Sequence, residues 1–235
     1  MNVHIISLDH LLYAFIPVLM VAWIYYRWSL NTTEVGISVL RMTVQLLLIG
    51  YVLAWIFEVE SAVILGLVLL VMALVSTWIA LRKVGQDRRT IYFRSLVVIT
   101  LSSLFILAVV VGGVLSLNPL GESRVVIPLA GMIFSSAMTA VGLAAERYYA
   151  DRSIGLGYRE ARNQAFSASM IPIINSMLAV GLVALPGMMT GQILSGVSPM
   201  LAVRYQIVVM CMILGVTGLA SALFLGWVVK DGEDG

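Results

Sequence analysis

The sequence predicts an all-α polytopic membrane protein with about seven transmembrane helices, and three observations carry this prediction. Of its 235 residues, 61% are hydrophobic and only 11% are charged, with a mean hydropathy of +1.03. Soluble domains carry about 25% charged residues, so this chain cannot cover itself with a solvated surface. The apolar residues form long runs that do not alternate, and basic residues gather between alternate runs. Because a backbone in lipid must satisfy its own hydrogen bonds, such runs are expected to be helices.

Seven runs approach the length of about 20 apolar residues that crosses the hydrocarbon core. We place them near residues 8–28, 37–57, 62–82, 92–117, 125–146, 170–194 and 203–229. The sixth run is the least regular, because Pro172, Pro186 and Gly187 interrupt it. No linker or low-complexity stretch divides the chain, so we expect one transmembrane permease domain over residues 1–235.

The basic residues predict the orientation of the helices. Twelve of the 14 Lys and Arg residues flank or follow the first, third, fifth and seventh runs. They are Arg27, Arg41, Arg82, Lys83, Arg88, Arg89, Arg94, Arg147, Arg152, Arg159, Arg162 and Lys230. Only Arg124 and Arg204 belong to the other side. Cytoplasmic loops are the basic ones, which puts the N-terminus outside the cytoplasm and the C-terminus inside.

The sequence shows no energy source of its own. Neither lysine can serve a P-loop, since Lys83 precedes Val84 and Lys230 precedes Asp231 rather than Ser or Thr. Ionisable residues fall at the ends of the predicted helices and none lies mid-span, which disfavours a proton relay or an intramembrane hydrolase. We therefore expect no catalytic residues and no cofactor in this chain. Either the protein is passive or another subunit drives it.

A few polar and sulfur-bearing residues at membrane depth are candidates for a substrate path. These are Gln45, Ser136, Asn175, Ser176, Met188 and Met189. The alternative for the polar residues is ordinary packing, because Pro172 frees a backbone carbonyl that needs a partner. Methionine thioethers suit soft metal ions, but the alternative that the two methionines fill gaps in the packing is favoured. The sequence leaves the metal ligands unknown.

Three stretches resemble one known family. They are GYVLAWIF (50–57), VIPLAGMIFSSAMTAVGL (126–143) and VGLVALPGMMTGQILSGVSPMLAVRYQI (180–207). They resemble the FetB-type ABC transporter permeases, which include bacterial iron-export permeases and plant aluminium-tolerance relatives. The specific part is LPGMM-T-G followed by P-x-x-A-x-x-Y-Q-I. The family pattern tends to carry Asn where this chain has Ser136 and Asp where it has Asn175.

The resemblance implies a permease subunit that exports a metal such as iron. It also implies that this subunit lies in a cell membrane, most naturally the bacterial inner membrane. It implies two partners besides the lipid bilayer, which are a soluble ABC ATPase that binds ATP and a second copy of the permease. We expect the ATPase to contact a cytoplasmic coupling segment at about 147–169, where a turn at Gly155 and Gly157 precedes a short helix over 158–166. The predicted contact residues are Gly155, Gly157, Tyr158, Arg159 and Arg162. The alternatives are a stand-alone carrier or channel, or a membrane scaffold that transports nothing.

Overall fold

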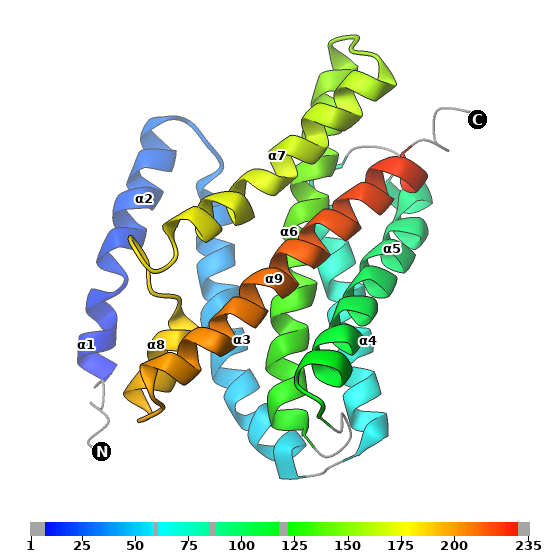
Figure 1. The fold of residues 1–235 in the computed structure, drawn as a ribbon. Coiled ribbons are helices and arrows are strands. Elements are labelled where there is room, and N and C mark those ends of the chain that lie inside the picture. Colours follow the sequence, from blue (N-terminus) through cyan, green and yellow to red (C-terminus); the bar gives the residue numbers. More distant parts are fainter. Residues whose placement is uncertain (1–7, 59–60, 85–87, 118–121, 230–235) are drawn as a thin grey trace. The chain divides into compact units, whose positions relative to one another are not determined.

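The structure is all-α, as predicted (Figure 1). It is a computed structural model, and it describes residues 8–58, 61–84, 88–117 and 122–229. Within these ranges there is no β-strand, and six helices are long and apolar enough to cross a membrane. The contacts divide the chain into two compact units, Met1–Val59 and Glu60–Gly235, which we describe separately.

The first unit contains a broken helix followed by a long one. Its helices are α1 (Leu8–Tyr13), α2 (Ile16–Arg27) and α3 (Thr32–Glu58). The sequence predicts one helix over 8–28, but the helix is interrupted at Ala14 and Phe15. Their N–H groups donate to the carbonyls of Leu11 and Leu12, three residues back, as in a tightened last turn. Pro17 then lies in the first turn of α2, where its missing N–H costs no helical hydrogen bond.

The second unit is a bundle arranged around one central helix. Its elements are α4 (Ala62–Ala80), α5 (Arg88–Ala108) continued by the π-helix η1 (Val109–Val114), α6 (Ser123–Ser153), α7 (Tyr158–Ala179), α8 (Gly187–Leu194) and α9 (Pro199–Leu223) continued by the π-helix η2 (Phe224–Val228). Helix α6 contacts α4, α5, α7 and α9. Its contact face is rich in small residues, and Ala130, Ala137 and Ala144 are fully buried. Small side chains let helices approach closely, and this approach supplies the attraction between helices in lipid.

Helix α6 is longer than the sequence predicts. Its 31 residues would span about 46 Å, whereas a hydrocarbon core is about 30 Å thick. The predicted helix ends at residue 146, because the charged residues that follow it indicate a loop. The structure instead continues the helix through Ser153, so its last turns lie beyond the membrane together with the start of α7.

The sixth predicted transmembrane helix, 170–194, is not one continuous helix. Helix α7 passes through Pro172 without ending and stops at Ala179; a turn follows, and α8 begins only at Gly187. Gly181 has φ of +82°, a conformation that favours glycine. The N–H groups of the turn have partners within it, since that of Gly181 donates to the carbonyl of Ala184 and those of Leu182, Val183 and Ala184 donate to the carbonyl of Ala179. Such a break is tolerated at membrane depth only where backbone partners are supplied in this way or by a cavity.

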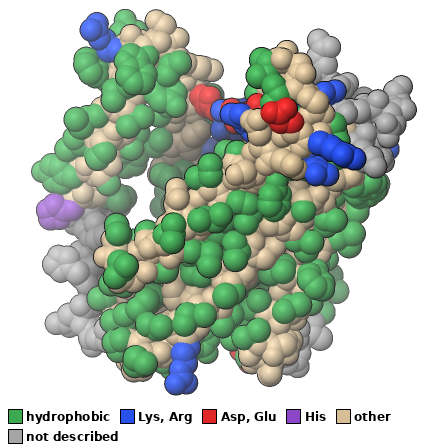
Figure 2. All heavy atoms as spheres, turned by 45° about the horizontal axis from the view of Figure 1, so that its top comes forward, with side chains coloured by type: hydrophobic (Ala, Val, Ile, Leu, Met, Phe, Trp, Pro, Cys, Tyr) green, Lys and Arg blue, Asp and Glu red, His purple; other side chains and the backbone are tan. Residues whose placement is uncertain are grey.

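The charges of the second unit divide between its two ends as the sequence predicts. One end holds the end of α4, the start of α5, the end of α6 and the start of α7. Its described basic side chains are Arg82, Lys83, Arg94, Arg147, Arg152, Arg159 and Arg162. Arg124 and Arg204 belong to the opposite end, at the starts of α6 and α9, and Lys230 lies outside the described residues. Figure 2 shows charged side chains gathered at the end that carries the α6–α7 connection.

The close approach of α6 to α4 yields a stability prediction. A Cβ added at Gly142 of α6 would lie 3.3 Å from the backbone oxygen of Ala80, whereas one added at Gly66 of α4 meets nothing within 4 Å. Alanine favours a helix over glycine by about 0.5–1 kcal/mol, so Gly66→Ala should raise the thermal unfolding midpoint in detergent. Gly142→Ala should lower the midpoint relative to Gly66→Ala, because α4 and α6 must move apart. Equal midpoints for the two variants would contradict this packing.

Candidate functional site

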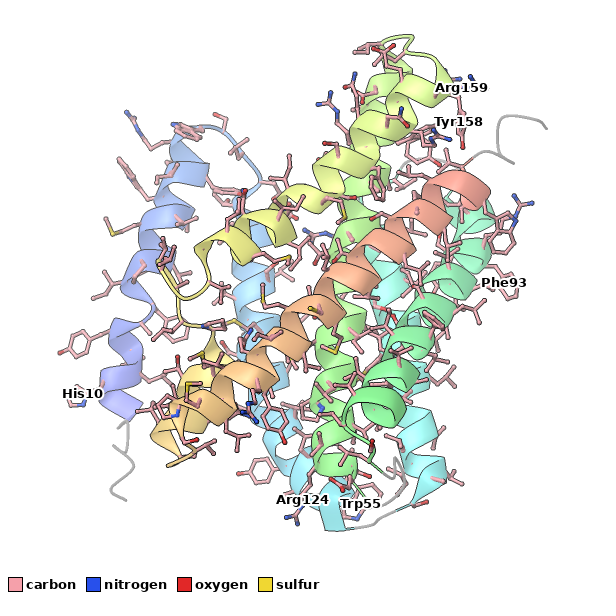
Figure 3. The ribbon with its side chains drawn as sticks, viewed as in Figure 1. His10, Trp55, Phe93, Arg124, Tyr158 and Arg159 are labelled. Atoms are coloured by element: carbon pink, nitrogen blue, oxygen red, sulfur yellow. The ribbon has the colours of Figure 1, made fainter. Side chains whose placement is uncertain are left out.

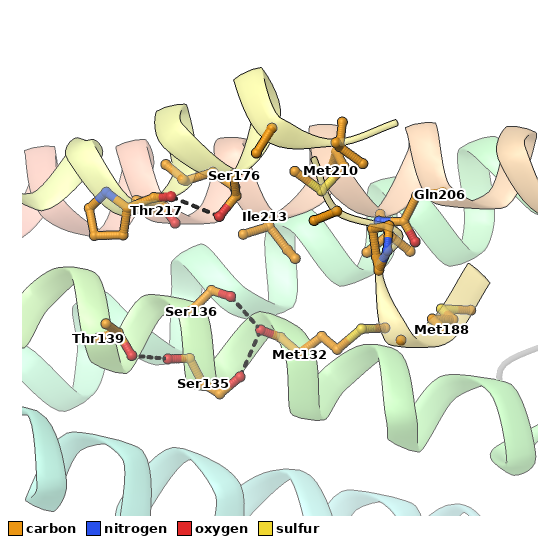
Figure 4. Close-up of a pocket in the computed structure, with 18 of the residues that line it drawn as sticks. Met132, Ser135, Ser136, Thr139, Ser176, Met188, Gln206, Met210, Ile213 and Thr217 are labelled. Carbon is orange, nitrogen blue, oxygen red and sulfur yellow. Dashed lines mark hydrogen bonds between the residues drawn. The ribbon is translucent and has the colours of Figure 1, made fainter. Parts of the chain in front are cut away.

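A cavity of about 600 Å³ lies in the second unit between α6, α7, α8 and α9. We call it the central cavity. Most of its wall is apolar, but it is crossed by polar side chains from three helices (Figure 4). They are Ser135, Ser136 and Thr139 of α6, Ser169 and Ser176 of α7, and Gln206 and Thr217 of α9. Sites of this size with a mainly apolar wall and a few polar groups are typical of small-solute binding.

Five of the six hydroxyl groups of this cavity, all but that of Thr217, donate their hydrogens to backbone carbonyls of their own helices. Ser136 Oγ donates to the carbonyl of Met132 at 2.8 Å, and Ser135 Oγ donates to the same oxygen at 3.1 Å. Ser176 Oγ donates to the carbonyl of Pro172 at 2.8 Å, on the opposite wall. A hydroxyl has one hydrogen and two acceptor lone pairs, so what remains for a solute is acceptor capacity. The arrangement therefore suits a cation or a solute with hydrogen-bond donors.

Gln206 is the most unusual polar residue of the central cavity. Its side chain is only 6% exposed, and its Oε1 atom has no hydrogen-bond partner among the described residues. Leaving a buried acceptor unpaired costs about 1–3 kcal/mol, so native proteins rarely do so without a reason. An incoming donor or cation would satisfy this oxygen.

Half of the predicted path residues line the central cavity. Those that do are Ser136, Ser176 and Met188. Asn175 is exposed on α7 and does not line it, because adjacent residues point about 100° apart around a helix. Met189 is likewise absent from the wall, although its neighbour Met188 is present. Gln45 is exposed on α3 of the first unit and is not among the residues that line this cavity.

The predicted coupling residues gather in a helical hairpin at the basic end of the second unit. We call residues 147–164 the α6–α7 hairpin. The chain turns at Gly155, whose φ is +87°, and Gly157 caps the start of α7. Arg147 holds the two helices together, since its Nε donates to Asp151 at 2.9 Å and its Nη2 donates to Gln164 at 2.6 Å. Asp151 is buried, whereas the Arg147 side chain is 48% exposed, so the ion pair lies at the surface of the hairpin with only its carboxylate shielded from solvent.

Tyr158 joins the hairpin to the end of the last helix. Its hydroxyl donates to the backbone carbonyl of Leu225 in η2 at 2.9 Å. Its ring lies edge-on to Tyr148, with centroids 6.3 Å apart, and the Arg162 guanidinium sits 5.7 Å from its centre. Arg159 and Ile154 remain exposed, and Ile154 is 73% exposed at the tip. Figure 3 shows Tyr158 and Arg159 at this end and Arg124 at the opposite one. The hairpin thus has a fixed base and a free tip.

One helix connects the hairpin to the central cavity. Helix α7 runs unbroken from Tyr158 to Ala179, and its residues Pro172, Ile173 and Ser176 line the cavity. Its 22 residues correspond to about 33 Å. A helix is stiff along its axis, so a displacement of the hairpin would be carried to the cavity wall.

Comparison with known proteins assigns the family. The model of an uncharacterised protein family, UPF0014, matches residues 8–154 and 155–231. The chain belongs to UPF0014. It is 32% identical over 240 residues to "Probable iron export permease protein FetB" of Escherichia coli (strain K12), covering 95% of this chain and 91% of the relative. It is 32% identical over 232 residues to "Protein ALUMINUM SENSITIVE 3" of Arabidopsis thaliana, covering 91% and 84%. No solved structure matches the chain.

This UPF0014 member is a membrane protein, as its apolar helices and its relatives agree. The relatives include "UPF0014 membrane protein YjkA" of Bacillus subtilis (strain 168), 34% identical over 227 residues that cover 84% of this chain and 87% of the relative. The family match is divided between Ile154 and Gly155, at the tip of the α6–α7 hairpin.

Sequence reasoning missed Gln206 in this UPF0014 chain, although its signal was present. Gln206 lies in the P-x-x-A-x-x-Y-Q-I run that carries the resemblance, and it is a lone amide in an apolar helix. The predicted helix began at residue 203, which put Gln206 in the first turn, where polar residues are ordinary. The structure begins α9 at Pro199, so Gln206 lies two turns into the helix and faces the cavity.

The hairpin turn gives a prediction with a matched control. Alanine at positive φ costs about 1–2 kcal/mol, so Gly155→Ala should lower the thermal unfolding midpoint. Gly157 has φ of −65° and ψ of 154°, which alanine adopts readily, and an added Cβ would meet nothing within 4 Å at either position. Gly157→Ala should therefore leave the midpoint unchanged or slightly higher. The hairpin geometry is wrong if Gly155→Ala proves as stable as Gly157→Ala.

Proposed function

We propose that this protein is the permease subunit of an ABC-type exporter, and that a separate soluble ATPase drives it. The observation that carries the proposal is the continuous helix α7, which begins in the α6–α7 hairpin and ends beside the central cavity. A transporter powered from outside the membrane needs such a rigid connection between the surface that receives the force and the site that holds the solute.

The hairpin has the properties of a docking surface for a soluble subunit. Ile154 exposes an apolar side chain at the tip, and Arg159 exposes a positive charge in the first turn of α7. A small apolar anchor surrounded by charged groups is the usual composition of a specific protein interface. The Arg147–Asp151 ion pair and the Tyr158 hydrogen bond fix the base of the hairpin, so that force at the tip is not lost in local bending.

The cargo we propose is a metal cation, with ferrous iron as the first candidate. The name of the Escherichia coli relative refers to iron export. The central cavity offers acceptor oxygens from its hydroxyls and from Gln206, which suit a cation. Its polar wall residues are all uncharged, so a divalent ion would be held weakly and could leave again. We further propose that two copies of the permease assemble with the ATPase, as the resemblance to ABC permeases implies.

A charge reversal tests the docking surface. In proteoliposomes that contain the permease and the ATPase that co-purifies with it, Arg159→Glu should reduce ferrous-iron-stimulated ATP hydrolysis about tenfold, because the tip then repels or misplaces its partner. A tenfold loss corresponds to about 1.4 kcal/mol. The matched control is Arg204→Glu, which reverses an exposed charge at the opposite end of the unit and should leave the stimulation unchanged.

Two results would count against the proposal. The first is that no protein with a nucleotide-binding P-loop co-purifies with the permease from its own membranes. The second is that Arg159→Glu and Arg204→Glu support the same stimulated rate of ATP hydrolysis.

A further inference from the structure

A second cavity, of about 410 Å³, lies next to the central cavity toward the opposite end of the unit from the hairpin. We call it the outer cavity. The start of α6, the residues that follow η1, α8 and the first turns of α9 line it. Its polar residues include Glu122, Arg124, Gln192 and Tyr205. Since the hairpin end is the basic one, the outer cavity belongs to the side that the positive-inside rule places outside the cytoplasm.

Three residues line both cavities, and each comes from a different helix. They are Met132 of α6, Met188 of α8 and Val209 of α9. Figure 4 shows the Met132 side chain extending toward Met188, with Gln206 beside them. These apolar side chains therefore form the partition between two chambers that are otherwise neighbours. Methionine has three rotatable bonds and adapts its shape easily, so such a partition can open without a rearrangement of the backbone.

Each chamber is lined by a glutamine whose side-chain oxygen is buried without a partner. Gln206 lines the central cavity, and Gln192 lines the outer cavity. Both atoms are buried, and neither has a hydrogen-bond partner among the described residues. Each unpaired acceptor lowers the stability of the fold by about 1–3 kcal/mol, and packing alone gives no reason to keep one on either side of an apolar partition. They are explained if a solute with donors or positive charge passes from one to the other.

We propose that Met132, Met188 and Val209 form the gate between two halves of one translocation path, with Gln206 and Gln192 as its inner and outer solute contacts. This inference rests on the proposed function, because it assumes that a solute crosses the protein. Apolar constrictions block the passage of ions by excluding water from the narrow segment. The closed gate would keep a hydrated cation in one chamber. Displacement of a methionine would let the cation pass from the amide oxygen of Gln206 to that of Gln192.

Thiol accessibility tests the gate without the ATPase or any cargo. In a Cys211→Ala background, which removes the single native cysteine, Gln192→Cys and Gln206→Cys each place one thiol in one chamber. The probe is a membrane-impermeant, positively charged methanethiosulfonate, added to the side of the membrane on which Arg124 lies. Gln192→Cys should react, and Gln206→Cys should react at least tenfold more slowly, because the closed gate separates it from that side.

Truncation of the gate should remove this difference. Adding Met188→Ala to Gln206→Cys should raise its reaction rate about tenfold, and Met132→Ala provides a second truncation on another helix. The control is Met200→Ala, since Met200 is 71% exposed and lines neither cavity. A gate at this position is excluded if Gln206→Cys reacts as fast as Gln192→Cys in the intact protein, or if neither truncation changes its rate. Because the assay needs no ATP hydrolysis, an error in the proposed ATPase coupling would leave these rates unaffected.

Discussion

The contact between α6 and α7 is the interaction on which both candidate sites depend. At the hairpin end the two helices pack through small side chains, and Ala144, Ala161 and Ala165 are fully buried. Outside the membrane this contact also removes apolar surface from water, and within the lipid dispersion is the main attraction between the two helices. Farther along, α7 runs obliquely across α6 (Figure 1), and the space that opens between them, α8 and α9 is the central cavity. One helix pair therefore forms the rigid hairpin at one end and the solute chamber at the other.

The break between α7 and α8 shows how the chain combines a cavity with the demands of a lipid environment. A helix that continued straight past Ala179 would satisfy every backbone group but could not fold back to form the cavity wall. The chain changes direction at the turn around Gly181. Three N–H groups of this turn, which no longer have helical partners, donate to the carbonyl of Ala179. Pro186 and Gly187 then restart the chain as α8, which brings Met188 to the wall. The sequence features that weaken the sixth predicted helix are those that build the site.

The sequence predicts correctly the features that depend on composition, such as the fold class. It predicts poorly the features that depend on contacts between distant residues, such as the length of α6. Long apolar runs and separated basic residues sufficed for an all-α membrane protein, since these follow from solvation alone. The length of α6 beyond residue 146 was missed, because its charged last turns are stabilised by partners on α7, such as Gln164, that lie far away in sequence. Ser136 and Ser176 were predicted because they are polar at membrane depth, and both line the central cavity. Gln206 was missed because the predicted helix began at residue 203 rather than at Pro199. The wall shared by Met132 and Met188 was missed because it depends on how separate helices meet.

The central claim is that this protein moves its solute with energy supplied by another protein. The direct measurement is ferrous iron transport into inside-out proteoliposomes against a tenfold concentration gradient, with the purified permease alone and with its ATPase partner plus ATP. The account predicts net uphill transport only when the partner and ATP are both present. Uphill transport by the permease alone, driven by a proton or sodium gradient, would contradict it.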